Sequence, residues 1–285
     1  MNVWVEAARP RTLSAGLAPV LVGTAAAEAF IAWRFVAALV VGVSIQIGVN
    51  YANDLFDAER GVDTGERLGP RRAVAAGLVS PARMRVALTV VLLVAGAAGL
   101  ALALATTLWL LVIGLLCFAA LVGYSGGPRP FASAGLGEVF VFLFFGLVAT
   151  VGSAFVQSEA ITVVAVVAAI PVGLLAVALL VINNLRDIPT DRAAGKHTLA
   201  VRIGERRTRM LYGALLVATP AALTGLAGAD ESLWPLLGWG CAPLLVKSGL
   251  VAREAGGRDL VPALGATGLA QLVLGVLVAV GLWIS

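Results

Sequence analysis

The sequence predicts an all-α protein, a polytopic transmembrane bundle of about nine helices. Hydrophobic residues make up 60% of the 285 residues and charged residues only 13%, whereas a soluble domain carries about 25% charged residues. Apolar segments long enough to cross a bilayer follow one another along almost the whole chain. No polar stretch between them is long enough to fold separately, so residues 1–285 are expected to form a single integral membrane domain.

A transmembrane helix requires about 20 mostly apolar residues. Such segments lie at about 13–31, 34–53, 84–104, 107–124, 136–156, 160–182, 210–228, 233–251 and 260–284. The first segment also has a feature of signal peptides, because Ala25, Ala26 and Ala27 resemble a cleavage site. The second segment follows almost immediately, however, and Arg9 and Arg11 are typical of an ordinary cytoplasmic flank. The first segment is therefore expected to stay in the protein.

The distribution of charge predicts the orientation of the bundle. With nine spans and a cytoplasmic N-terminus, all of the 20 lysine and arginine residues except Arg34 lie on the cytoplasmic side. The opposite loops carry Glu28, Glu159, Asp230 and Glu231. Basic residues accumulate on the cytoplasmic side of membrane proteins, so we expect a multi-pass protein of the inner (plasma) membrane with its C-terminus outside. The net charge of +4 is then explained by topology and does not indicate a nucleic-acid partner.

Two long polar segments, at about 54–83 and 183–209, are predicted to be cytoplasmic loops. Each follows a span that ends in asparagine and aspartate residues, at 50–54 and at 183–187. Four spans, an even number, separate these two motifs, so both must face the same compartment. This arrangement predicts two parallel four-helix pseudo-repeats.

The first motif concentrates carboxylates at the end of a predicted span. Asn50, Asp54 and Asp57 share one helical face, Asn53 neighbours Asp57 in the same way, and Asp63 follows in the loop. Carboxylates this close together repel one another unless a cation joins them. Mg²⁺ is usually held by one or two carboxylates together with substrate phosphate oxygens, so the motif predicts a magnesium site.

The second motif contains Asn183, Asn184, Asp187 and Asp191. Asn183 and Asp187 lie one helical turn apart. Pro189 disfavours helical geometry at the residue before it, so Asp191 is expected in the loop just beyond the helix end.

Basic residues surround both motifs, among them Arg72, Arg186 and Lys196. Carboxylates for a metal, interleaved with cations for phosphate, are the groups that a diphosphate leaving group requires. The plainer interpretation is a set of solvated loop charges with helix-capping asparagines. Two matched clusters on one side of the membrane favour function, because polar groups at membrane depth are costly. The single histidine, His197, is expected to be an ordinary surface residue.

These motifs resemble those of the UbiA superfamily of intramembrane aromatic prenyltransferases. The first motif of that family usually reads N-D-x-x-D-x-x-x-D, and residues 53–57 match its beginning. Gly61 stands where the third aspartate is expected, and Asp63 follows two residues later. This departure is similar to the MenA branch, whose acceptor is 1,4-dihydroxy-2-naphthoate. Further segments that resemble this branch lie at 9–13, 17–23, 68–74, 124–128, 135–138 and 183–196.

The resemblance implies an enzyme of nine helices. It would transfer a polyprenyl group from polyprenyl diphosphate to 1,4-dihydroxy-2-naphthoate, with Mg²⁺ and with loss of CO₂, giving demethylmenaquinone. The Mg²⁺ ligands would be Asp54, Asp57, Asp63, Asp187 and Asp191, of which Asp54, Asp57, Asp187 and Asp191 are also taken as catalytic. Substrates would be bound by Asn50, Asn53, Arg72, Tyr124, Glu138, Asn183, Asn184, Arg186 and Lys196, with Tyr124 and Glu138 at the acceptor end.

Two alternatives remain open. The first is a prenyltransferase of the same superfamily with another acceptor, such as 4-hydroxybenzoate, homogentisate or a phosphoribose. The second is a cation or phosphate transporter. A transporter is expected to place its polar residues near the bilayer midplane, whereas the two motifs here lie at the cytoplasmic ends of spans.

The predicted topology can be tested with reporter fusions. Alkaline phosphatase fused after Ser285 is expected to be active, and the same enzyme fused after Arg209 inactive, because only the first fusion point lies outside. The opposite pair of results would contradict the nine-span topology.

Overall fold

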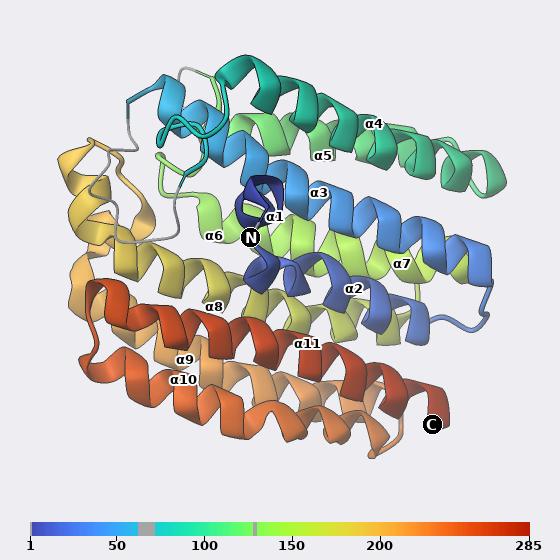
Figure 1. The fold of residues 1–285 in the computed structure, drawn as a ribbon. Coiled ribbons are helices and arrows are strands. Elements are labelled where there is room, and N and C mark those ends of the chain that lie inside the picture. Colours follow the sequence, from blue (N-terminus) through green and yellow to red (C-terminus); the bar gives the residue numbers. More distant parts are fainter. Residues whose placement is uncertain (1, 62–71, 128–129) are drawn as a thin grey trace.

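The computed structural model describes residues 2–61, 72–127 and 130–285, and every regular element in these ranges is a helix (Figure 1). The elements of the first half are α1 Val3–Ala8, η1 Pro10–Thr12, α2 Ser14–Ala25, α3 Ala32–Glu59, α4 Pro81–Ala105 and α5 Trp109–Ser125. The following elements are α6 Gly137–Val141, η2 Phe142–Val148, α7 Ala149–Ser158 and α8 Val163–Ala193. The last are α9 Leu199–Ala229, η3 Trp234–Cys241, α10 Ala242–Glu254, η4 Gly257–Leu260 and α11 Val261–Ile284.

Seven helical segments in the described part of the chain are long and apolar enough to cross a membrane. Two shorter apolar helices, α2 and α5, stand where the first and fourth spans were predicted. The prediction of an all-α transmembrane bundle is therefore confirmed, and the chain is an integral membrane protein. The count of nine complete spans is not confirmed, because α2 has only 12 residues, a rise of about 18 Å against a hydrocarbon core of about 30 Å.

Glycine residues allow neighbouring helices to approach α2 closely. A Cβ atom on Gly16 would lie 2.5 Å from the carbonyl oxygen of Gly42 on α3, and one on Gly23 would lie 2.0 Å from the carbonyl oxygen of Thr150 on α7. On a third side, a Cβ atom on Gly275 of α11 would lie 2.8 Å from the Cβ atom of Ala18. Small residues of this kind are what membrane helices use to pack backbone against backbone, and here they place α2 among three longer helices.

The helices that carry the two motifs are longer than a bilayer requires. α3 has 28 residues and α8 has 31, which correspond to about 42 Å and 47 Å. Their motif ends lie at the same end of the bundle, and the C-terminus lies at the opposite end (Figure 1). The expectation that both motifs face one side is therefore met by the arrangement of the helices.

The prediction of a long loop at 183–209 is wrong. Helix α8 continues to Ala193, and α9 begins at Leu199. Asp191 consequently lies on the helix and not in a loop beyond it. Leu185, Ile188 and Asp191 are buried on the extended part of α8, whereas Pro189 is exposed. Packing of the buried face has outweighed the local preference of a residue that precedes proline.

Tryptophan side chains gather at the end opposite the motifs. Trp33, Trp109, Trp234 and Trp283 are exposed and lie at the starts of α3, α5 and η3 and near the end of α11. Tryptophan is enriched at membrane interfaces. The edge helix α4 has only 22% of its most apolar segment buried, against 72% for α8, so α4 faces lipid and α8 forms the centre of the bundle.

Arg34, the single basic residue predicted outside, joins three helix ends at the tryptophan-rich side. Its Nη1 donates to the carbonyl oxygen of Val156 at 2.9 Å and to Glu159 at 3.1 Å, and its Nη2 donates to the carbonyl oxygen of Ala105 at 2.9 Å. The last carbonyl groups of a helix lack partners within the helix. Arg34 therefore satisfies the ends of α4 and α7 from its position at the start of α3.

Replacement of Arg34 is expected to loosen this end of the bundle. Arg34→Met should lower the free energy of unfolding by about 1–3 kcal/mol, because two partly buried carbonyl groups lose their donor. The melting temperature in detergent should fall by about 5 °C. Glu159→Gln is the matched control: the Glu159 side chain is 51% exposed, and an exposed ion pair contributes little. Equal melting temperatures for Arg34→Met and the unmodified protein would contradict this role.

Candidate active site

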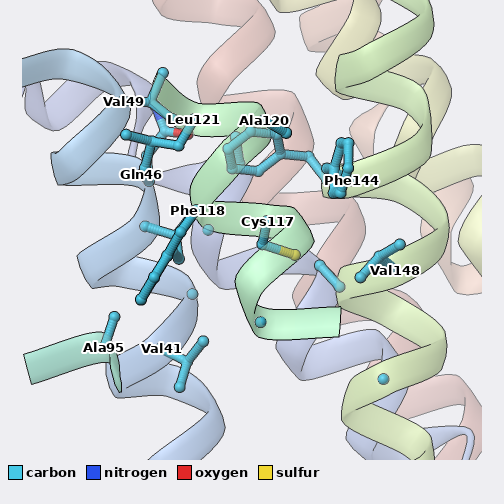
Figure 2. A pocket seen from close by; sticks show the side chains of 18 of the residues that line it. Val41, Gln46, Val49, Ala95, Cys117, Phe118, Ala120, Leu121, Phe144 and Val148 are labelled. Carbon is cyan, nitrogen blue, oxygen red and sulfur yellow. The ribbon is translucent and has the colours of Figure 1, made fainter. Parts of the chain in front are cut away.

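A cavity of about 510 Å³ lies among α2, α3, α4, α5, η2, α7 and α8, within the size range of small-molecule sites. Figure 2 shows Val41, Gln46 and Val49 of α3 on one side and Phe144 and Val148 of η2 on the other, with side chains of α5 between them. Most of the lining is apolar. The cavity is therefore suited to a hydrophobic chain or ring.

A turn of π-helix shapes one wall of the cavity. Residues Phe142–Val148 form this turn, and Phe144, Phe145 and Val148 line the cavity. On its other face, a Cβ atom on Gly146 would lie 2.7 Å from the Cα atom of Gly173 on α8. π-Helical turns occur frequently at functional sites, and here the turn presents aromatic side chains to the cavity while its backbone packs on α8.

Several polar residues of the cavity lining lie at the motif end. Asn50, Asn53, Tyr124 and Asn183 line it there, together with Arg9. Along α3 the lining extends from Asn53 back to Ala38, about 22 Å at helical rise. The described aspartates of the two motifs are not part of the lining. On α3 and α8 they follow the lining asparagines within one or two helical turns, so the apolar cavity leads to the carboxylates.

Among the carboxylates of the first motif that the structure describes, Asp57 is the most enclosed, with 0% of its surface exposed. Its Oδ1 accepts from Arg60 Nη2 at 2.9 Å, and its Oδ2 accepts from Arg72 Nη2 at 3.3 Å and from Lys196 Nζ at 3.1 Å. Lys196 belongs to the link that follows the second motif. The ion pair between Lys196 and Asp57 therefore joins the two motifs.

Asp54 has a different environment. Its carboxylate accepts from the backbone N–H groups of Ala73 at 2.8 Å and of Val74 at 3.0 Å. It thereby fixes the segment that leads into α4 and carries Arg72. Asp63 lies outside the described residues.

The second motif is organised around Arg186, which is 2% exposed. Its guanidinium donates to both oxygens of Asp187, at 2.7 Å each, and to Asn183 Oδ1 at 2.8 Å. Asp191 is buried one turn further along α8, and its carbonyl oxygen accepts from the backbone N–H of Lys196 at 2.8 Å. Basic side chains and backbone amides therefore lie beside the described carboxylates of both motifs.

The predicted substrate-binding asparagines also have protein partners. Asn50 Nδ2 donates to the carbonyl oxygen of Ala8 at 2.9 Å and to Thr12 Oγ1 at 3.1 Å. Asn53 accepts a hydrogen bond from Ser125 at the end of α5. Asn184 Nδ2 donates to Glu138 Oε1 at 3.3 Å. These contacts hold the N-terminal segment, α5 and α6 against the two motif helices.

Tyr124 and Glu138 are neighbours in the structure. Tyr124 lines the cavity, and its hydroxyl oxygen would lie 3.2 Å from a Cβ atom on Gly137, the residue before Glu138. Glu138 is 9% exposed and is not part of the lining. Arg9, Arg60 and Ser125 were not predicted as site residues, although Arg9 and Ser125 lie in segments that resemble the family.

The oxygen-rich donor set fits a hard divalent cation. In the ranges that the structure describes, no three histidine, cysteine, aspartate or glutamate side chains are grouped so that they could hold a metal ion. Mg²⁺ does not require three, because substrate phosphate oxygens complete its coordination. Asp57 and Asp187 are buried beside positively charged side chains. Each carboxylate is therefore suited to bind Mg²⁺ in place of one of these side chains.

Comparisons with known proteins agree with this arrangement. Residues 16–261 match the UbiA prenyltransferase family. The chain is 44% identical over 280 residues to the 1,4-dihydroxy-2-naphthoate octaprenyltransferase of Mycobacterium tuberculosis, covering 97% of this chain and 95% of the relative. It is 36% identical over 300 residues to the enzyme of the same name from Escherichia coli, covering 100% of this chain and 96% of that relative.

Solved structures share the fold. A UbiA homolog from Aeropyrum pernix superposes with a TM-score of 0.74 at 18% identity, covering 94% of this chain and 97% of that one. A UbiA homolog from Archaeoglobus fulgidus bound to GPP and Mg²⁺ superposes with a TM-score of 0.69 at 17% identity, covering 99% of both chains. At these identities the similarity bears on the fold alone.

The contact between the two motifs generates a prediction. Lys196→Met should lower the catalytic efficiency with a prenyl diphosphate by about 100-fold, because a preorganised cation beside a leaving group has an effect of this order. His197→Gln is the matched control, since the His197 side chain is exposed and should leave the rate unchanged. Near-normal turnover of Lys196→Met in a steady-state assay would remove Lys196 from the site.

Proposed function

Because this chain belongs to the UbiA prenyltransferase family, we propose that it transfers a polyprenyl group from polyprenyl diphosphate to 1,4-dihydroxy-2-naphthoate. CO₂ and diphosphate are the by-products, and the lipid product is demethylmenaquinol, the reduced form of demethylmenaquinone, because the acceptor keeps both of its hydroxyl groups. The observation that carries the proposal is the position of an apolar cavity directly beside two aspartate motifs and their basic partners. Two relatives, both named 1,4-dihydroxy-2-naphthoate octaprenyltransferase, match the chain over nearly their whole lengths and support the choice of acceptor.

Basic side chains bind and neutralise the diphosphate. Arg60, Arg72 and Lys196 surround Asp57, and Arg186 pairs with Asp187. When the allylic C–O bond breaks, its electron pair leaves with the diphosphate, and negative charge grows on that group. Cations fixed before the reaction stabilise this charge at little reorganisation cost.

Mg²⁺ would be held by Asp54, Asp57, Asp187 and Asp191, with Asp63 as a further ligand. When bound, it supplies additional neutralisation of the leaving group. Asn53 and Asn183 orient the phosphate oxygens at the mouth of the cavity, while Asn50 keeps the N-terminal segment in place. UbiA homologs of Archaeoglobus fulgidus bound to Mg²⁺ and to Cd²⁺ support the use of a divalent cation.

The cavity protects the allylic cation. Its apolar lining excludes water, which would otherwise capture the cation and release a free alcohol. An electron-rich ring carbon of the acceptor donates the electron pair that forms the new C–C bond. The bond between the ring and the carboxylate breaks as CO₂ leaves, and its electron pair restores the aromatic ring. Tyr124 lies at the polar end of the cavity, and we assign Tyr124 and Glu138 to the acceptor end.

The same features argue against the transporter alternative. The charged motif residues lie at the ends of α3 and α8, and the cavity between them is apolar. We propose that the protein lies in the plasma membrane with its motif end facing the cytoplasm. The concentration of basic residues at that end supports this orientation. Residues 1–285 would then act as one enzyme domain.

The acceptor assignment predicts the products. With 1,4-dihydroxy-2-naphthoate, a long-chain prenyl diphosphate and Mg²⁺, the lipid product should lack the mass of CO₂, and carboxyl-labelled acceptor should release its label as gas together with diphosphate. 4-Hydroxybenzoate should be used about 10- to 100-fold less efficiently, because a one-ring acceptor buries less apolar area in a two-ring site. Mass spectrometry and label release measure both outcomes.

Metal removal supplies the control for this assay. EDTA should abolish activity, and added Mg²⁺ should restore it. Retention of the naphthoate carboxylate, or faster prenylation of 4-hydroxybenzoate, would contradict the acceptor while leaving prenyl transfer itself intact.

A further inference from the structure

Arg9 brings a charge into a cavity that is otherwise uncharged. Among the described residues that line the cavity it is the one charged side chain. It lies with Asn50, Asn53 and Tyr124 at the polar end. An arginine guanidinium stays protonated in proteins, so a ligand in the cavity meets a permanent positive charge.

The backbone at Arg9 is held in an unusual conformation. Its φ of 53° and ψ of 73° lie in the left-handed region, which residues other than glycine rarely occupy. Thr12 Oγ1 donates to the Arg9 carbonyl oxygen at 3.0 Å. Asn50 Nδ2 donates to the carbonyl oxygen of Ala8, the residue before Arg9, at 2.9 Å. Gln46 Nε2 donates to Thr12 Oγ1 at 3.2 Å. Strained residues fixed by several contacts concentrate at functional sites.

We propose that Arg9 binds the carboxylate of the aromatic acceptor. A planar guanidinium matches a carboxylate through two parallel hydrogen bonds. The diphosphate already has basic partners at the motifs, where Arg72, Arg186 and Lys196 lie beside carboxylates. Those three basic residues are not part of the cavity lining, whereas Arg9 is. This assignment rests on the proposed function, and it names the group that recognises the acceptor.

The same cavity offers a surface for the rings of the acceptor. Phe140 and Phe144 both line it, and their rings are stacked with centroids 6.0 Å apart and an angle of 22° between the planes. Phe131 stacks on Phe140 with centroids 4.3 Å apart, which fixes the orientation of Phe140. A flat two-ring acceptor can place its faces along these rings while its carboxylate reaches Arg9.

Paired acceptors test the inference. Arg9→Gln should raise the KM for 1,4-dihydroxy-2-naphthoate by about 10- to 100-fold, the effect of losing a charge-assisted hydrogen bond. It should leave the KM for the prenyl diphosphate unchanged. With 1,4-dihydroxynaphthalene, which lacks the carboxylate, Arg9→Gln and the unmodified protein should behave alike. Arg9→Lys should recover part of the preference for the carboxylated acceptor, because it keeps the charge but not the paired hydrogen bonds.

Arg11→Gln is the matched control. Arg11 is two residues away, is exposed and does not line the cavity, so all three KM values should remain unchanged. In the unmodified protein, 2-naphthoate should compete with the acceptor and 2-naphthamide should not, a measurement that does not depend on the folding of a variant.

Each contrary result has a distinct meaning. A raised KM for the prenyl diphosphate in Arg9→Gln, with an unchanged KM for the naphthoate, would overturn the inference and assign Arg9 to the diphosphate. An equal loss with both acceptors, or equal inhibition by 2-naphthoate and 2-naphthamide, would also overturn it. Failure of the unmodified protein to prenylate 1,4-dihydroxy-2-naphthoate would instead contradict the proposed function.

Discussion

The burial of carboxylates at one end of a membrane bundle is the constraint on which the site depends. An enclosed charge is costly unless a partner compensates it, and Asp57 has no exposed surface. Its partners come from three places: Arg60 one turn along, Arg72 before α4, and Lys196 after α8. Three features bring these charges together. Helices α3 and α8 extend beyond bilayer length, and the link after Ala193 is short. The Asp54 carboxylate also accepts hydrogen bonds from the backbone at 73–74.

The cavity and the charged site form one continuous arrangement with separate tasks. The apolar part between α3, α5 and η2 accommodates hydrocarbon, and the motifs accommodate phosphate and metal. The asparagines at the boundary are bound to other parts of the protein: Asn50 to the N-terminal segment, Asn53 to α5, and Asn184 to α6. The hydrogen bonds that join α3 to the N-terminal segment and to α5, and α8 to α6, therefore lie where the apolar cavity meets the charged site.

Periodicity and charge were sufficient to predict the all-α class and the shared face of Asn50, Asp54 and Asp57, because helical spacing alone determines that face. The spacing could not predict that α8 continues through Pro189, since burial of Leu185 and Ile188 is a tertiary effect. Hydropathy likewise overestimated α2: the segment after Ala25 is apolar, yet it turns, and the backbone N–H of Ile31 donates to Gln157 on α7 at 2.7 Å. Arg9 gave no local signal beyond its segment, because its place in the cavity depends on contacts with α3.

The ion pairs around Asp57 and Asp187 have a consequence for turnover. If the basic side chains had no anionic partner after the products leave, water would have to enter this buried region to solvate their charges before each new cycle. Here the carboxylates already stand beside Arg72, Arg186 and Lys196 at hydrogen-bonding distance. When diphosphate leaves, these basic side chains have carboxylate partners within the protein, so their charges need not be compensated by water alone.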